Sequence, residues 1–243
     1  MAIISIQYIF TSANGSQVVF DLRLDSCTLD LLNDIPSELP AWTKLEFHQC
    51  PHCPLLKAET PHCPLSVQLI NIVKGFQHLS SYDPIHVEVV TLERKVSLET
   101  TAQRAIGSIM GLIIATCGCP HTTFFKPMAR FHLPLASEDE TIYRAAANYL
   151  LAQYFLSNQG QKPDFELKGL KKIYENMQII NNTIAKRLRA ATETDSSLNA
   201  IILLDLYAKA MPYVIKEALE EIRQLFVPFL VQGQTIGVSE SSS

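Results

Sequence analysis

The sequence lacks the features that mark several large classes of protein. It has no excess of basic residues: 24 acidic residues outnumber 20 basic ones, for a net charge of −4, so we expect no binding to nucleic acid. It also lacks a positively charged N-terminal region followed by a cleavage site of small residues, which argues against a secretory signal peptide. These absences predict a cytoplasmic protein.

Long apolar runs are also missing. The most apolar stretch, residues 105–117, is too short to cross a hydrocarbon layer of roughly 30 Å, so it predicts a buried helix and no membrane association. The chain has no Gly-rich phosphate loop, no dinucleotide-binding fingerprint and no Ser–His–Asp arrangement. The sequence therefore identifies no reaction class and no small-molecule ligand.

Clustered cysteine and histidine are what the chain does have. Residues 48–63 hold three cysteines and three histidines, and residues 117–121 read Cys-Gly-Cys-Pro-His. With 243 residues, 47% of them hydrophobic, the chain can bury a core without disulfides. In a reducing compartment, clustered cysteines more often bind metal or do redox chemistry than form disulfides. We interpret the two clusters as one metal site.

Strand signals dominate the first hundred residues. Residues 3–10 and 17–24 are rich in β-branched and aromatic side chains and flank Asn14-Gly15, which is typical of a β-hairpin. Residues 42–47 alternate as a third strand that leads to Cys50, and residues 85–96 as a further strand. Together they predict a small mixed sheet.

Helix signals separate and follow these strands. Pro64 is expected to begin a helix that extends to residue 79, with Cys63 at its N-cap. A second helix, over 100–117, is expected to end at Gly118 in the left-handed conformation.

The second half is predicted to be helical. Residues 124–134 are bounded by prolines and expected to be extended, and Ser137 with Glu140 forms a capping box for a helix over 138–156. Further helices follow a linker at 160–163, and Pro212 is expected to open the last one. The predicted class is α+β: a metal-binding α/β domain at 1–137, a helical bundle at 138–232, and a disordered tail at 233–243.

Four cysteines are the best-placed metal ligands. Cys50 and Cys53 flank a tight Pro-His turn, Cys63 lies at a helix N-terminus where the dipole favours a thiolate, and Cys119 follows the end of the apolar helix. Tetrahedral sulfur suits zinc. Other residues of the clusters are possible substitutes for any one position: His48, His52, His62, Cys117 and His121.

Three other interpretations of the cysteines remain open. Prolines after the cysteines are also typical of [4Fe–4S] ligation, though structural zinc is the commoner use of such a turn. A redox role would make Cys63 the reactive thiol, but residues 54–61 intervene before any helix begins, unlike a thioredoxin motif. The third possibility is that reduced cysteines merely fill the core. This interpretation is favoured for Cys27, and for Cys117 it is at least as well supported as a role as metal ligand.

Arg130 and His132 form a second candidate group. Two residues apart in an extended segment, they would face the same side and could line the metal site, with Arg130 holding an anion and His132 acting as ligand or acid–base group. The alternative is that Arg130 anchors the helix capped at Ser137, beside a hydrogen-bonded core histidine.

The middle of the chain resembles an uncharacterised bacterial protein family. The likeness rests on these motifs: Trp42-Thr-x-Leu45, Gln49-Cys50-x-x-Cys53-Pro-Leu55, Cys63-Pro, Gly118-Cys119-Pro, Pro127-Met-Ala-Arg-Phe-His-Leu-Pro134 and Glu140-Thr141. The resemblance implies that the four cysteines belong together and that Arg130 and His132 matter to the same unit. It implies no activity.

The leading functional hypothesis is a non-catalytic protein in which four cysteines hold a structural zinc ion. Its C-terminal helices are expected to form a partner surface or to join copies in a homo-oligomer. The competing hypothesis is a metalloenzyme or a redox or iron–sulfur sensor that uses the cysteines with Arg130 and His132.

Overall fold

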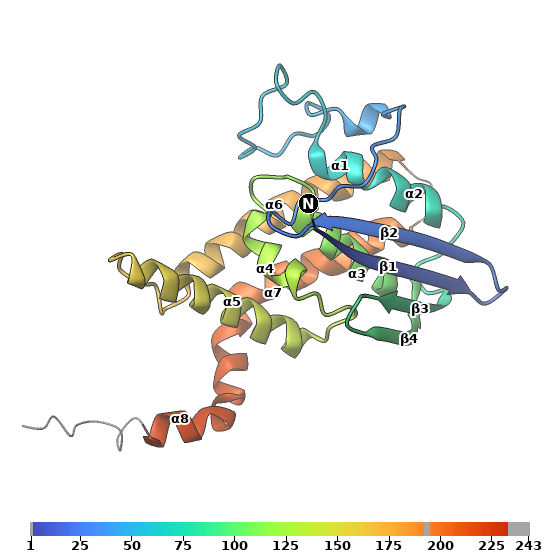
Figure 1. Ribbon diagram of the computed structural model, residues 1–243. Helices are drawn as coiled ribbons and strands as arrows, with labels where there is room; N and C mark the ends of the chain where they lie inside the picture. The colour runs from blue at the N-terminus through green and yellow to red at the C-terminus, as the bar shows by residue number, and fades with distance from the viewer. Residues whose placement is uncertain (1, 192–194, 233–243) are drawn as a thin grey trace, which may run out of the picture.

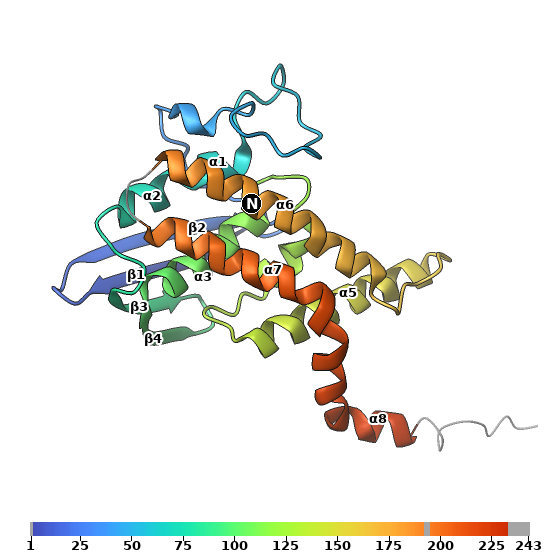
Figure 2. The same cartoon turned by 180° about the vertical axis from the view of Figure 1, so that it is seen from behind.

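The computed structural model describes residues 2–191 and 195–232. One antiparallel sheet packs with one face against the helices (Figures 1 and 2). Its strands are β1 (Ile3–Ser12), β2 (Gln17–Asp25), β3 (Pro84–Val90) and β4 (Lys95–Thr101), in the spatial order β2-β1-β3-β4.

The predicted N-terminal hairpin is confirmed. Gly15 has a φ of 83°, a conformation that glycine adopts without steric cost, and the Ser16 amide donates to Asn14 Oδ1 at 2.9 Å. In β1, Ile6, Tyr8 and Phe10 are buried while the residues between them are more exposed. This period of two places one face of the sheet against the core.

The predicted mixed sheet is wrong, because every strand pair is antiparallel. Residues 85–96 do not form one strand: the Thr91 amide donates to the Arg94 carbonyl at 2.9 Å, and the chain turns back as β4. This second hairpin adds β3 to the free edge of β1 with the opposite direction. The short tight turn was missed because it contains neither glycine nor proline.

The predicted strand at 42–47 is also wrong. Ala41–Thr43 is a 3-10 helix followed by turns, and only Lys44 makes an isolated bridge, to His62. Trp42 and Leu45 are both buried, and a spacing of three residues suits a turn better than a strand.

Eight α-helices occur in the described residues, with bounds α1 (Pro64–Gln68), α2 (Ile70–Phe76), α3 (Ala102–Thr116), α4 (Lys126–Arg130), α5 (Glu138–Asn158), α6 (Lys168–Ala191), α7 (Ser196–Glu221) and α8 (Val227–Gln232). The predicted start at Pro64 with Cys63 as N-cap is confirmed, although the helix is interrupted at Leu69. The capping box of Ser137 and Glu140 at the start of α5 is confirmed as well.

Two helical predictions need correction. Residues 124–134 are not extended throughout, because a 3-10 helix (Thr123–Phe125) leads into α4, where Pro127 occupies a first-turn position that proline tolerates. Pro212 does not open the last helix but lies inside α7. Figure 2 shows α7 bending part-way, as expected where a proline removes one helical hydrogen bond, and leading α8 away from the body.

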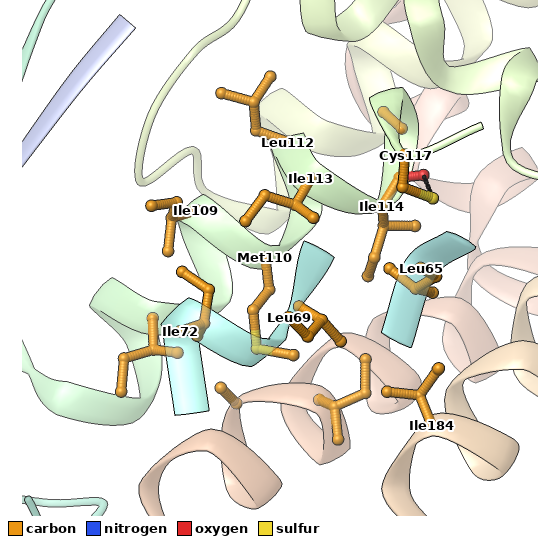
Figure 3. Packing of buried hydrophobic residues seen from close by; sticks show 14 of the residues in the cluster. Leu65, Leu69, Ile72, Ile109, Met110, Leu112, Ile113, Ile114, Cys117 and Ile184 are labelled. Atoms are coloured by element: carbon orange, nitrogen blue, oxygen red, sulfur yellow. Dashed lines mark hydrogen bonds between the residues drawn. The ribbon is translucent and has the colours of Figure 1, made fainter. Parts of the chain in front are cut away.

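A single hydrophobic core joins the sheet to the helices. It runs from Ile6 of β1 to Ile215 of α7, so it includes residues on both sides of the predicted boundary after residue 137. Figure 3 shows side chains of α3, such as Met110 and Ile114, in one cluster with Leu65, Leu69 and Ile184 of α6. The predicted disordered tail lies outside the described residues.

The sequence also predicted that its most apolar run, residues 105–117, is too short to cross a membrane. Within 2–191 and 195–232, none of the helices combines the length and the apolar character needed to span a bilayer.

Candidate metal centre

The four predicted cysteine ligands line one small cavity. Its volume is about 20 Å³, and Cys50, Cys53, Cys63 and Cys119 all contribute to its wall. The space is enclosed by the loop before α1, the N-terminus of α1, the loop after α3 and one face of α6. A cavity of this size holds about one water molecule, so it suits a single ion.

Local hydrogen bonds position these cysteines. The Cys53 amide donates to the Cys50 carbonyl at 3.0 Å, which closes the predicted tight turn. The Cys63 amide donates to the Thr43 carbonyl at 2.8 Å, which ties the start of α1 to the 3-10 helix. Gly118, with a φ of 84°, ends α3 in the left-handed conformation and turns the chain so that Cys119 reaches the cavity.

Arg187 is the charged residue of this cavity. It is 1% exposed on α6, and its Nη1 donates to the carbonyls of Trp42 and Lys44 at 2.8 Å each, while Nη2 donates to that of Leu45 at 2.9 Å. Its Nε is buried and makes no hydrogen bond in the described structure.

Among the described residues, Arg187 also has no carboxylate partner for its charge. No salt bridge joins it to a carboxylate of residues 2–191 or 195–232. Burial lowers the pKa of the guanidinium, and the nearby thiols of Cys63, Cys50 and Cys53 counteract that shift. The guanidinium therefore favours negative charge on those sulfur atoms.

Without a bound cation, burial favours the neutral thiol at two of the four cysteines, Cys50 and Cys119. Burial raises the pKa of Cys50, and it raises the pKa of Cys119 to about 11. Neighbouring cysteines add to both shifts, because like charges at close range disfavour one another. A metal must therefore displace protons to bind there.

The sulfur atoms share a wall but do not form a finished site. In the part of the chain that the structure describes, no group of three or more His, Cys, Asp or Glu side chains is already arranged to hold a metal ion. All six cysteines are free thiols. Metal binding at the cavity would therefore require the cysteine side chains to rearrange around the ion.

Of the substitute ligands, only His121 lines the cavity. The ring of His52 stacks against that of His121 with centroids 4.1 Å apart, and both ring nitrogens of His52 are buried without a hydrogen-bond partner in the described structure. His48 is exposed, and Nδ1 of His62 hydrogen-bonds with Thr43 Oγ1 at 2.8 Å. His52 and His121 are therefore the substitutes nearest to a ligand role.

The two remaining cysteines lie outside the cavity wall. Cys117 is buried and donates its thiol hydrogen to the Ile114 carbonyl at 3.3 Å. Burial raises the pKa of Cys117 to about 12. Cys27 is exposed.

Arg130 and His132 do not line the small cavity with the cysteines. Arg130 is exposed at the end of α4, with its guanidinium 5.3 Å from the centre of the Phe131 ring. His132 lines a larger cavity of about 220 Å³. Its Nε2 lies 2.6 Å from the hydroxyl of Tyr8, and burial lowers the pKa of His132 to about 3, which keeps the ring neutral. Neither residue lines the small cavity.

Sequence reasoning missed Arg187 and the larger cavity. Arg187 follows Ile180 and Ile184 at helical spacing, so a charged residue on the apolar face of a predicted helix was the available signal. The larger cavity joins α3, α5, α6 and α7, which no local pattern relates to one another.

Comparison with protein families decides where the chain belongs. Residues 6–227 match the family described as Domain of unknown function (DUF6901). The chain belongs to this family. The match covers most of the chain and agrees with the resemblance to an uncharacterised family. No match was found among curated proteins or among solved structures.

Proposed function

We propose that this DUF6901 protein binds metal, with one structural zinc ion held by Cys50, Cys53, Cys63 and Cys119. The observation that carries the proposal is the small cavity whose wall these four thiols share, although Cys119 is distant in sequence from the other three. Zinc in structural sites is almost always bound by four tetrahedral ligands at about 2.3 Å for sulfur. Closing the thiols on one ion would join the loop before α1, the start of α1 and the end of α3.

The buried Arg187 supports an anionic centre. Four thiolates around Zn²⁺ carry a net charge of −2, and a guanidinium beside them offsets part of that charge. The unpaired Nε of Arg187 would gain a sulfur acceptor. If the thiols stayed neutral, the described part of the chain would leave the buried Arg187 guanidinium without an anion, which is costly.

The cavity size favours zinc over an iron–sulfur cluster. Prolines follow all four cysteines, a feature shared with iron–sulfur ligation. However, a [4Fe–4S] cluster contains eight atoms, whereas a cavity of about 20 Å³ holds one.

A structural role is favoured over a catalytic one. Four protein ligands leave no open coordination position for a substrate. The raised pKa values of Cys50 and Cys119 make these thiols poor nucleophiles at neutral pH, which also argues against a redox role for them.

Elemental analysis of the purified protein tests this proposal. We expect one zinc per chain in the wild type, and a loss of most of it in Cys50→Ser and in Cys63→Ser. The matched controls are Cys27→Ser and Cys117→Ser, which change thiols outside the cavity wall and should retain zinc. Undiminished metal in both Cys50→Ser and Cys63→Ser would refute the ligand set, and iron with an iron–sulfur absorption band would favour the cluster.

We also propose that the C-terminal helices join two copies of the chain. Large apolar side chains are exposed on the outer part of α7 and beyond it, among them Tyr213, Leu225 and Phe229. They lie on the segment that leads away from the body in Figure 2. A second copy could cover this surface and remove it from water.

A double substitution, Leu225→Glu with Phe229→Glu, should convert the protein to a monomer without changing its zinc content. Introducing two charges into an apolar interface disfavours association, whereas the metal site is formed by other segments. Light scattering after size-exclusion chromatography measures the mass. Leu92→Glu, at an exposed position in the β3–β4 turn, is the control that should leave the mass unchanged. A monomeric wild-type protein would contradict the proposal.

A further inference from the structure

The larger cavity has a mainly apolar wall with a few polar groups. It measures about 220 Å³ and lies among α3, the segment around α4, α5, α6 and α7. Leu112, Met128 and Met177 form part of its apolar wall. None of the six cysteines lines it, so it is separate from the candidate metal centre.

A glycine keeps part of this space open. Gly111 lies in the interior of α3 and lines the cavity. A Cβ atom built there would meet nothing within 4 Å, so no close packing requires glycine at this position. Glycine also destabilises a helix interior relative to alanine. The space beside Gly111 is therefore available to a bound molecule.

Arg144 is a cation on the cavity wall that forms no salt bridge with the described residues. Arg144 of α5 is half-buried, and its Nη2 donates to the carbonyls of Met128 and Phe131 at 2.7 and 2.8 Å. Within residues 2–191 and 195–232, Arg144 donates hydrogen bonds only through Nη2, and no carboxylate there forms a salt bridge with it. Glu140 is near enough for its charge to act on Arg144, but its carboxylate accepts the Ser137 amide in the capping box.

Two more polar groups on the wall are consistent with a ligand. Arg104 is exposed and adds a second positive charge. Asn181 of α6 is 2% exposed, and its Oδ1 makes no hydrogen bond in the described structure. Unpaired buried polar atoms are uncommon in native proteins and call for an explanation.

We propose that this cavity binds a small monocarboxylate with an apolar body, whose carboxylate pairs with Arg144. A guanidinium pairs with a carboxylate through two parallel hydrogen bonds, and the apolar wall would bury the rest of the molecule. Because Arg104 is exposed to solvent, Arg144 is the one half-buried guanidinium on the wall, which suits a monoanion better than a phosphate dianion.

The volume sets the size of the ligand. An apolar cavity of 150 Å³ in another protein binds benzene, so 220 Å³ accommodates roughly nine non-hydrogen atoms, with the carboxylate at the mouth. Medium-chain fatty acids and arylalkanoic acids have this size.

Calorimetric titration with octanoate, 3-phenylpropanoate and indole-3-acetate tests the proposal. We expect at least one of them to saturate the protein at one site per chain. The matching alcohol of that acid should bind at least about tenfold more weakly, because it cannot form the charged pair. Equal affinity for acid and alcohol, or no saturable binding of any acid up to about 5 mM, would overturn the proposal.

Two pairs of variants locate the site. Arg144→Gln should weaken binding of the acid by roughly 10- to 100-fold, whereas Arg130→Gln, the same change at an exposed position outside the cavity, should leave it unaltered. Gly111→Leu should fill the cavity and abolish binding, and Gly111→Ala should retain it.

The two Gly111 variants also provide a control for misfolding. Both variants replace a helical glycine with a better helix former, so both should raise the melting temperature. Wild-type affinity in a folded Gly111→Leu protein would overturn the assignment to this cavity, even if Arg144→Gln failed to fold.

Discussion

Removing the proposed zinc ion with a chelator should accelerate amide exchange around the cysteines by about 10³-fold, equivalent to about 4 kcal/mol of lost local stability. The binding energy of a structural metal is folding energy for the segments that it joins. Exchange at the amides of Leu45, Cys53 and Cys63 measures the local stability of this region directly, because these amides donate to backbone carbonyls within or beside the cysteine loop. Hydrogen exchange with and without zinc measures the change residue by residue.

The sheet supplies an internal control for this experiment. The ladder between β1 and β2 lies in the same molecule but contributes no residue to the small cavity, so its amides should keep their protection. Exchange in Cys63→Ser should match that of the chelated wild type. Identical exchange at Cys53 and Cys63 before and after complete zinc removal would contradict a structural role for the metal.

Replacing Arg187 with methionine should destabilise the protein by about 3–5 kcal/mol and lower Tm by roughly 10 °C. The change removes the donor of three carbonyls, and those of the buried residues Trp42 and Leu45 each cost about 1–3 kcal/mol when left unsatisfied. Urea unfolding measures the loss.

Arg189→Met is the matched control, because Arg189 is exposed two residues further along α6 and should change stability by less than about 0.5 kcal/mol. Zinc affinity distinguishes the effect of the Arg187 charge on the thiolates from its hydrogen bonds to the three carbonyls. If its charge stabilises the thiolates, the variant should bind zinc less tightly as well as unfold more easily. Wild-type stability in Arg187→Met would show that its carbonyl contacts are unimportant.

Local signals predicted the parts of the fold that local chemistry determines. Asn14-Gly15 specifies its hairpin turn, and the capping box at Ser137 specifies the start of α5, because each is completed by neighbours in sequence. The β3–β4 hairpin lacked such a signal, since residues 91–94 contain neither glycine nor proline. The predicted strand at 42–47 failed because three hydrogen bonds from Arg187, far along the chain, hold that segment in turns.

The candidate metal centre was likewise predictable only where neighbouring residues carry the signal. The four cysteines stood out because they cluster and suit one metal, and the structure brings them to one cavity. Arg130 and His132 were paired on the assumption of an extended segment, whereas α4 sends them to different surroundings. Arg144 and Gly111 carried no signal, because only the arrangement of α3, α5, α6 and α7 around one cavity brings them to the same wall.

X-ray absorption at the zinc edge of the native protein tests the central claim most directly. Four cysteine thiolates around one ion predict a first shell of four sulfur atoms at about 2.3 Å, and the loss of a sulfur atom or of the metal in Cys119→Ser. A protein that carries no zinc, or zinc with a shell of nitrogen and oxygen alone, would contradict it.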